Sequence, residues 1–300
     1  MRLSIWPNAA QPWNVIAEEV TALEEAGWDG VYVADHFMPN AGTGAADDPV
    51  LECGSMVTAL GALVDRVRIG SLVFGNTYRH PAMLANIAAT VDQVSGGRFT
   101  LGVGAGWQVN EHEQYGITLP PVGERVERFA EALEVIAGLL RRPTTTFAGK
   151  HYTLTDALCE PKPVQDPLPI LVGAGGDRML RLVARHADAW NTWGVPDHIA
   201  ERSATLTRAC EAAGRDPGAV ARSAQALVFF VDDDEAADRL VERVPRAAIA
   251  GRPERLRDVM AAYAEAGLDE FIVPDFTLGS GPAKLEALDR FIGEVAPAFR

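Results

Sequence analysis

Eight short apolar segments alternate along this chain with eight longer segments of helical periodicity, and this alternation limits the fold more than any other feature. Strands are expected at 2–6, 29–34, 67–74, 98–104, 168–173, 188–192, 222–231 and 269–274. Helices are expected between and after them, at 13–26, 50–64, 82–95, 122–141, 177–187, 196–213, 253–266 and 282–297. Such alternation is typical of parallel βαβ units. It predicts one α/β domain spanning 1–300, a (β/α)8 TIM barrel with insertion segments.

The long connections can be assigned to the two faces of such a barrel. Segments that follow strands lie at the catalytic mouth, which places 35–49, 105–121 and 232–252 there. The segment 143–167 follows a helix, so we expect it at the opposite face. It is predicted to contain a hairpin around Gly149-Lys150 and to have a structural role.

The composition excludes several classes of protein. A net charge of −14 argues against nucleic acid and anionic membrane as partners, because both favour clustered Lys and Arg. No apolar run reaches the ~18 residues of a membrane span, and the chain starts with a strand-like segment rather than a signal peptide. Its 3 cysteines predict neither a disulfide framework nor a zinc site. The sequence therefore predicts a cytoplasmic protein without a metal site.

Asp35 and His36 directly follow the second expected strand. A histidine changes charge near neutral pH, so His36 at the mouth is suited to acid/base catalysis. Asp35 would orient the histidine or bind a ligand, because an exposed aspartate is ionised at pH 7. A pair that only caps a turn is the structural alternative.

The sequence Arg79-His80-Pro81 opens the third expected helix. Proline fits the first helical turn, so His80 either prepares that turn or joins the site. Arg79 is expected to meet an anion or a carboxylate at the mouth. The other histidines are assigned to helices or to the surface, and no pattern of metal ligands accompanies them.

Two glycine-rich turns follow strands. In Gly102-x-Gly104-x-Gly106, Trp107 stands where a dinucleotide fingerprint needs its third small residue, so we instead expect a flat ring to approach the backbone there. The second turn, 173–176, precedes a helix that carries Arg178 in its first turn. Free N–H groups at a helix start can hold a phosphate, although an ordinary tight turn is the alternative.

Taken together, these motifs resemble the bacterial luciferase-like superfamily of flavin and deazaflavin oxidoreductases. The resemblance covers essentially the whole chain and is most specific from Tyr78 to Gly116. Within that superfamily, the chain resembles the branch that uses the deazaflavin coenzyme F420. The composition also favours this branch, because only 3 of the 27 basic residues are lysines, as in the GC-rich genomes that commonly encode it.

The resemblance implies an oxidoreductase that transfers a hydride between F420 and a small organic substrate at the barrel mouth. His36 would transfer the accompanying proton. A cis peptide bond at Leu72-Val73 would lie under the coenzyme ring. The residues implied in coenzyme binding are Asp35, Leu72, Val73, Asn76, Ala105, Gly106, Trp107, Asn110, Gly175, Gly176 and Arg178.

The resemblance leaves alternatives open. Related sugar-phosphate dehydrogenases carry a catalytic glutamate where this chain has Trp107, which argues against the same substrate. An FMN-dependent monooxygenase that activates O2 with reduced flavin from a partner reductase is one alternative. A barrel that binds flavin without catalysis is another. The superfamily also implies a homodimer.

Overall fold

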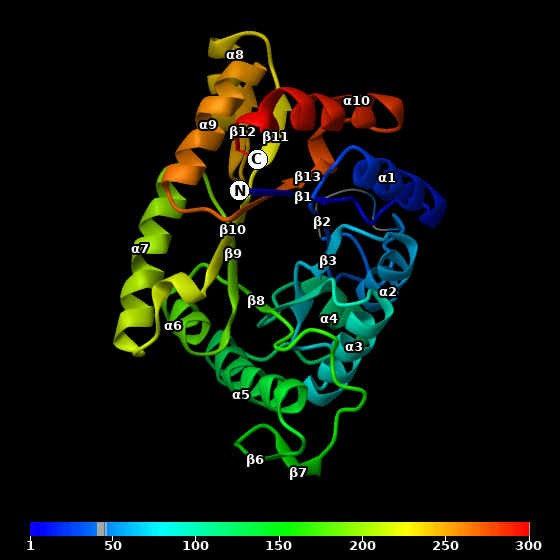
Figure 1. Ribbon diagram of the computed structural model, residues 1–300, viewed down its shortest axis with the longest axis vertical. Coiled ribbons are helices and arrows are strands. Elements are labelled where there is room, and N and C mark those ends of the chain that lie inside the picture. Colours follow the sequence, from blue (N-terminus) through cyan, green and yellow to red (C-terminus); the bar gives the residue numbers. More distant parts are fainter. Residues whose placement is uncertain (41–44, 46, 300) are drawn as a thin grey trace.

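The computed structural model describes residues 1–40, 45 and 47–299 and contains a closed parallel barrel. Its strands are hydrogen-bonded in the order β3-β2-β1-β13-β10-β9-β8-β5, and pairing of β3 with β5 closes the ring. Figure 1 shows these strands around the centre with the helices outside them. The predicted (β/α)8 fold is therefore confirmed. The barrel strands are β1 (Arg2–Trp6), β2 (Gly30–Val33), β3 (Arg68–Ser71), β5 (Phe99–Gly104), β8 (Ile170–Gly173), β9 (Ala189–Trp193), β10 (Ala221–Gln225) and β13 (Glu270–Pro274).

The helices around the barrel follow the apolar periodicity of the sequence. The last predicted helix, 282–297, is shorter than expected, because α-helical geometry ends at Arg290 and continues as a π turn and a 3₁₀ turn, η3 (Phe291–Val295) and η4 (Ala296–Phe299). The helices that follow barrel strands are α1 (Trp13–Glu25), α2 (Cys53–Leu63), α3 (Pro81–Val94), α5 (Val122–Arg141), α6 (Asp177–His186), α7 (Pro196–Ala212), α9 (Pro253–Glu265) and α10 (Pro282–Arg290).

Two predicted strands are interrupted. The strand predicted over 67–74 breaks at a cis peptide bond between Leu72 and Val73, as expected from the resemblance, and β4 (Phe74–Gly75) then pairs with β5. The strand predicted over 222–231 also divides, because β11 (Leu227–Phe230) leaves the barrel and pairs with β12 (Ala248–Gly251).

The long connections at the mouth contain further regular structure. The segment 232–252 holds α8 (Asp234–Arg243) as well as β12, and the segment 105–121 holds α4 (Val109–Tyr115). The segment 35–49 lies partly outside the described residues.

The predicted hairpin is present, but its expected position at the opposite face is wrong. Its strands are β6 (Thr145–Ala148) and β7 (Thr153–Ala157). They run back along α5, where the Glu131 carboxylate accepts hydrogen bonds from the backbone N–H groups of 150–152 at 2.8–3.1 Å. The Tyr152 hydroxyl then reaches Asn76, whose Nδ2 donates to it at 3.3 Å. The hairpin tip therefore lies at the catalytic face.

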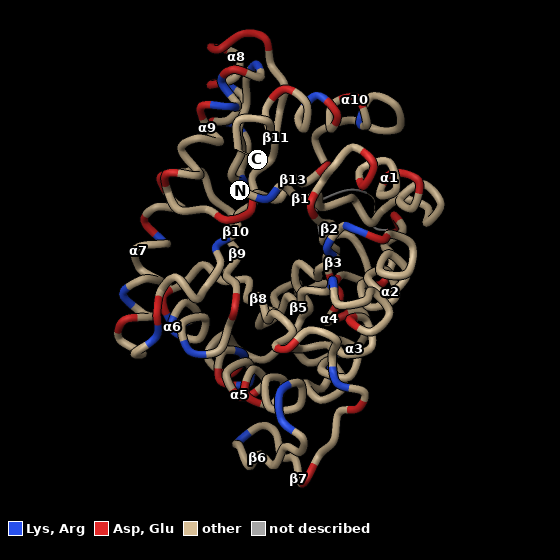
Figure 2. Tube along the Cα trace, viewed as in Figure 1, with Lys and Arg blue, Asp and Glu red and all other residues tan. Residues whose placement is uncertain are grey.

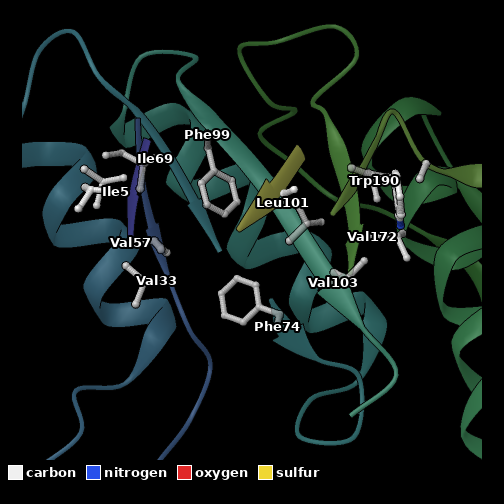
Figure 3. Close-up of a cluster of buried hydrophobic side chains, with 14 of the residues drawn as sticks. Ile5, Val33, Val57, Ile69, Phe74, Phe99, Leu101, Val103, Val172 and Trp190 are labelled. Carbon is white, nitrogen blue, oxygen red and sulfur yellow. The ribbon is translucent and has the colours of Figure 1, made fainter. Parts of the chain in front are cut away.

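The main hydrophobic core fills the layer between the strands and the helices. Strand side chains alternate between two faces, so Phe271 and Val273 on β13 point outward while Ile272 points into the barrel. Figure 3 shows part of the outer layer, with Phe74 and Phe99 near Leu101, and Val57 from α2 beside Val33.

The interior of the barrel also holds a polar cluster. Glu270 accepts hydrogen bonds from the Ser4 hydroxyl at 2.5 Å, the Tyr32 hydroxyl at 3.1 Å and the Arg2 guanidinium at 3.3 Å. Because buried polar groups are costly when unpaired, these bonds satisfy the carboxylate that β13 directs inward.

Two glycines of β5, Gly102 and Gly104, allow the segment from Ser71 to Val73 to pack closely against this strand. A Cβ at Gly102 would lie 1.9 Å from the Ser71 carbonyl oxygen and 3.1 Å from Val73, and one at Gly104 would lie 2.8 Å from Val73. The expectation that a flat ring approaches the backbone is therefore wrong at Gly102, where the Ser71 carbonyl occupies that space, whereas Gly104 also lines a cavity at the end of the strand. At Gly106, φ is +85° and an added Cβ would meet Thr77 at 2.4 Å.

The substitution Gly102→Ala tests this packing. It should lower the free energy of unfolding by about 3 kcal/mol or more, because the backbone carbonyl of Ser71 cannot move aside without disturbing the sheet. The matched control is Gly123→Ala in α5, where a Cβ meets nothing within 4 Å. That control should raise stability by up to about 1 kcal/mol. Urea unfolding followed by circular dichroism measures both, and equal stabilities would contradict the packing argument.

Candidate active site

A cavity of about 570 Å³ opens at the C-terminal ends of the barrel strands. This is where enzymes with this fold place their catalytic groups. Most of the predicted site residues line it: Asp35, His36, Leu72, Val73, Ala105, Gly106, Trp107 and Gly175. Residues outside the prediction also line it, among them Trp6, Tyr78, Arg125, Asn191, Thr192, Trp193, Gln225 and Arg246.

His36 is held by a buried carboxylate. Its Nδ1 lies 2.9 Å from Oε1 of Glu111, and the edge of its ring packs against Trp107 with the ring centroids 5.4 Å apart. The side chain of His36 keeps 25% of its surface exposed, whereas that of Glu111 is fully buried. Among the described residues, no hydrogen-bond partner is found for Nε2, the other ring nitrogen of this cavity-lining histidine.

Glu111 collects three hydrogen bonds. Oε1 accepts from the Tyr78 hydroxyl and faces His36, while Oε2 accepts from the backbone N–H of Phe37 at 2.9 Å. Burial alone would raise the pKa of Glu111, but these hydrogen bonds outweigh it and lower the pKa. The same arrangement raises the pKa of Tyr78, through desolvation first and the bond to Glu111 second. Glu111 is therefore held as a carboxylate.

Asp35 is buried, so the expectation of an exposed aspartate is wrong. Its carboxylate forms a two-pronged ion pair with Arg79, at 2.7 and 3.0 Å, and accepts the backbone N–H of Gly75 at 2.9 Å. Desolvation raises the pKa of Asp35, and the Arg79 guanidinium opposes that shift. Arg79 meets a carboxylate, as expected, and it also pairs with Glu52 at 2.5 Å.

His80 lies at the start of α3. Its Nδ1 accepts the backbone N–H of Ala82 at 3.2 Å, and Pro81 occupies the first turn. The turn-forming alternative is therefore correct for His80. Assignment of His112 to a helix is also correct, but this residue is buried: Nδ1 bonds to the Gln108 carbonyl at 2.6 Å and Nε2 to Thr77 at 2.8 Å.

The turn before α6 is open. A Cβ at Gly175 or Gly176 would meet no atom within 4 Å, and no side chain caps the helix. Asp177 at the first helical position is paired with Arg202 at 2.5 Å, which offsets its negative charge. Arg178 lies outside the main cavity and reaches Glu127 at 3.9 Å, so its predicted phosphate contact needs a different side-chain position.

Two further predicted residues lie apart from the main cavity. Asn76 lines a neighbouring cavity of about 450 Å³ that also contains Tyr152. Asn110 donates to the Pro39 carbonyl at 2.9 Å and lines neither cavity. The position of Asn110 therefore argues against direct contact with a coenzyme and favours a role in holding the loop after β2.

The outer part of the main cavity is aromatic. Trp6 packs against Trp193 and Phe276, with centroids 5.8 and 5.1 Å apart, and the Arg246 guanidinium lies 5.1 Å from the Trp193 ring. Gln225 is buried beside them, and its Oε1 has no partner within the described part of the chain. This wall combines flat apolar surfaces with a few polar groups, as binding sites for small molecules do.

Metal sites, membrane spans and basic surface stripes were each sought in the described part of the chain. Among residues 1–40, 45 and 47–299, no cluster of His, Cys, Asp and Glu could hold a metal ion. No helix within the same ranges has both the length and the apolar character needed to cross a membrane. Figure 2 shows basic segments scattered over the outer elements and next to acidic ones, not gathered into a continuous stripe.

Fold and site together define an α/β-barrel protein with a ligand cavity and a histidine–glutamate pair at its catalytic mouth. A family model described as luciferase-like monooxygenase matches residues 1–249, and the chain belongs to this family. This confirms the resemblance seen in the sequence.

Several curated relatives carry the same name. The F420-dependent glucose-6-phosphate dehydrogenase of Beutenbergia cavernae is 30% identical over 342 aligned positions, which cover 100% of this chain and 98% of that protein. The protein of the same name from Microbacterium testaceum is 35% identical over 192 residues. That match covers 64% of this chain and spans about half, 54%, of the relative.

Solved structures share the fold. An F420-dependent secondary alcohol dehydrogenase in complex with an F420-acetone adduct has a TM-score of 0.84 at 21% identity, covering 100% of this chain and 99% of the other. The coenzyme F420 dependent tetrahydromethanopterin reductase from Methanopyrus kandleri has a TM-score of 0.82 at 19% identity, with the same coverage.

The Asp35–Arg79 pair gives a prediction for stability. Arg79→Met leaves a buried carboxylate without its cation and should lower the free energy of unfolding by about 3–5 kcal/mol at neutral pH. The deficit should narrow as the pH falls, because loss of Arg79 raises the folded-state pKa of Asp35, and protonation then removes the unpaired charge.

The matched control is Arg239→Met, which removes an exposed pair with Glu235. This change should alter stability by less than about 1 kcal/mol at any pH. Urea unfolding at several pH values measures both variants. Equal losses in the two would show that the Asp35–Arg79 pair does not stabilise the mouth.

Proposed function

We propose that this chain is an F420-dependent oxidoreductase that transfers a hydride between the coenzyme and a small organic substrate with a hydroxyl or carbonyl group. The observation that carries the proposal is the cavity-lining His36, held at Nδ1 by the buried carboxylate of Glu111. The names of the curated relatives support F420 as the coenzyme.

The residues at the mouth fit this coenzyme. The cavity volume, about 570 Å³, is in the range of cofactor sites. Leu72 and Val73 form its inner wall, Ala105 and Gly106 a side wall, and the open turn at Gly175 leaves room for a phosphate beside helix N–H groups. Bound there, F420 would supply the hydride chemistry.

His36 would move the proton. Oxidation of an alcohol releases a hydroxyl proton together with the hydride, and Nε2 of His36 can accept it because Nδ1 is engaged by Glu111. Reduction of a carbonyl would use the same nitrogen as the donor. Trp6 and Trp193 would hold the apolar part of the substrate, and Arg246 or Gln225 a polar part.

Glucose 6-phosphate is a weaker candidate for the substrate than the relatives' names suggest. Trp107 occupies the position of the second catalytic group in those enzymes, according to the resemblance, and it packs on His36 instead. Of the three lysines, Lys284 is buried and bonded to Asp275 and Glu19, and Lys150 lies outside the main cavity.

Coenzyme binding and turnover distinguish the proposed function from two alternatives, an FMN-dependent monooxygenase and a non-catalytic flavin-binding barrel. The protein would be titrated with F420 and with FMN, and binding followed by fluorescence. We expect tighter binding of F420; tighter FMN binding would favour the monooxygenase that takes flavin from a partner reductase. Binding of either without turnover of any alcohol, ketone or sugar phosphate would favour a non-catalytic barrel. Cytoplasmic location stays a prediction.

The substitution His36→Asn tests proton transfer. With F420 saturating, turnover should fall by roughly 10²–10⁴-fold while the Kd for F420 changes little. The assay uses the fastest substrate from a panel that includes 2-propanol and glucose 6-phosphate. Loss of F420 binding with unchanged turnover per bound coenzyme would instead make His36 a binding residue.

The turn at Gly176 should hold the coenzyme phosphate. Because no atom lies within 4 Å of a Cβ there, Gly176→Leu should fold normally but obstruct the phosphate. We expect weaker binding of intact F420 and little change for the phosphate-free ring fragment. Gly123→Leu on α5 is the control for an added side chain. Equal losses for both ligands would place the phosphate elsewhere.

A homodimer is also part of the proposal. Met83 and Val94 on α3 expose 63% and 43% of their surface, and Leu158 and Val164 from the segment beside this helix expose 68% and 53%. Gln93 of α3 bonds to the Lys162 carbonyl of that segment at 2.7 Å, so these residues belong to adjoining elements. Such a face favours contact with a second copy.

Sedimentation at micromolar concentration tests the dimer. The wild type should sediment at twice the monomer mass of 32.2 kDa. The double substitution Met83→Glu and Leu158→Glu should produce the monomer, whereas Val109→Glu on α4, also at an exposed apolar residue, should not. A wild type that sediments only as the monomer would overturn the proposal.

A further inference from the structure

We propose that Glu111 is a positioning residue that fixes the tautomer of His36, with the proton on Nδ1 and the lone pair of Nε2 directed to substrate. This inference rests on the proposed role of His36 in proton transfer. It adds a residue to the reaction, because Glu111 lines neither cavity and acts only through the histidine.

The tautomer follows from the hydrogen bonds of the carboxylate. Oε2 accepts from the Phe37 backbone N–H, which can only donate, and Oε1 faces both Nδ1 of His36 and the Tyr78 hydroxyl. An ionised carboxylate has no hydrogen to give. Nδ1 must therefore carry the hydrogen in this contact, and in the neutral ring Nε2 then holds the lone pair.

The surroundings keep this carboxylate ionised and the ring in place. Glu111 is fully buried, and it accepts hydrogen bonds from the Phe37 backbone N–H at Oε2 and from the Tyr78 hydroxyl at Oε1, both of which favour its ionised form. The Trp107 ring lies nearly perpendicular to the imidazole, with the ring centroids 5.4 Å apart. The other polar groups nearby already have partners, since Asp35 bonds to Arg79 and His112 bonds to Thr77 and Gln108.

This arrangement matters at both stages of proton transfer. Before transfer, it presents an acceptor rather than a donor to a substrate hydroxyl. After transfer, the positive imidazolium lies 2.9 Å from a fully buried carboxylate, and this charge-assisted contact stabilises it. The same logic makes an orienting carboxylate important for histidine bases in other enzymes.

Three variants separate the positioning role from a structural one. Glu111→Gln keeps the size of the side chain but offers one accepting oxygen, so at least one of the three donors loses its partner. Tyr78→Phe removes a donor and leaves the carboxylate with His36 and Phe37. Glu113→Gln is the matched control, because it removes an exposed carboxylate from the same helix, α4.

Nitrogen-15 NMR of the imidazole groups reads the tautomer directly, without coenzyme or substrate. The His36 signals are assigned by their loss in His36→Asn. At a pH where the ring is neutral, the wild type, Tyr78→Phe and Glu113→Gln should have hydrogen on Nδ1. Glu111→Gln should lose that preference while keeping the wild-type circular dichroism spectrum. Hydrogen on Nε2 in the wild type, or the wild-type tautomer in Glu111→Gln, would overturn the proposal.

Turnover supplies the second measurement. With F420 saturating and the substrate chosen above, Glu111→Gln should lose roughly 10²–10⁴-fold in kcat, with the Kd for F420 within twofold of the wild type. Glu113→Gln should lose nothing. A lost tautomer with unchanged kcat would refute the positioning role. Full activity of His36→Asn would instead refute the proposed function, and the NMR result would still decide how Glu111 acts on the ring.

If Glu111→Gln does not fold, Glu111→Asp is the second variant. It retains a carboxylate on a shorter side chain, so the Nδ1 hydrogen should persist with a weakened bond. Its kcat should lie between those of the wild type and His36→Asn. An Asp variant with wild-type folding and no tautomer preference would count against the proposal.

Discussion

The ion pair between Asp35 and Arg79 is the interaction on which the mouth of the barrel depends. It joins the end of β2 to the segment after β4 and continues to Glu52, whose carboxylate caps α2 through the N–H groups of Gly54 and Ser55. Both ends of the β2–α2 connection are thereby tied to the β4–α3 connection at the cavity. Because His36 follows Asp35 directly, the ion pair also fixes the position of the His36 backbone.

The barrel itself could be predicted from the sequence because its signal is local and repeated. Each strand is a short apolar run and each helix has a clear 3.6-residue period, so eight units could be counted without any contact information. The exceptions are instructive. In the run 222–231, the residues that pair with β9 and β13 are mostly polar, whereas the β11 residues that pair with β12 are all apolar. A single strand assigned to the whole run did not use this change of composition.

Only the part of the site that has a local sequence signal could be predicted. Asp35 and His36 follow a strand end, a position that the sequence reveals, whereas Val73 was predicted inside a strand and entered the site only through the resemblance. Glu111 and Tyr78 come from other connections, and only folding brings Glu111 to His36 and Tyr78 to Glu111. A glutamate on a short helix carries no sequence sign of being buried. Asn110, two residues past Gln108 and next to Glu111, was selected by motif alone, and its amide turns toward Pro39.

The hairpin β6–β7 gives this barrel an additional way to diversify. In most barrels of this kind the mouth is built from the eight βα connections, so a change in recognition requires a change in one of them. Here the connection between α5 and β8 starts at the opposite end of the barrel, runs back along α5 and places Tyr152 in the wall of the second cavity. Evolution can therefore lengthen or shorten an αβ connection and reshape a cavity wall, while every segment that carries a proposed catalytic group keeps its length.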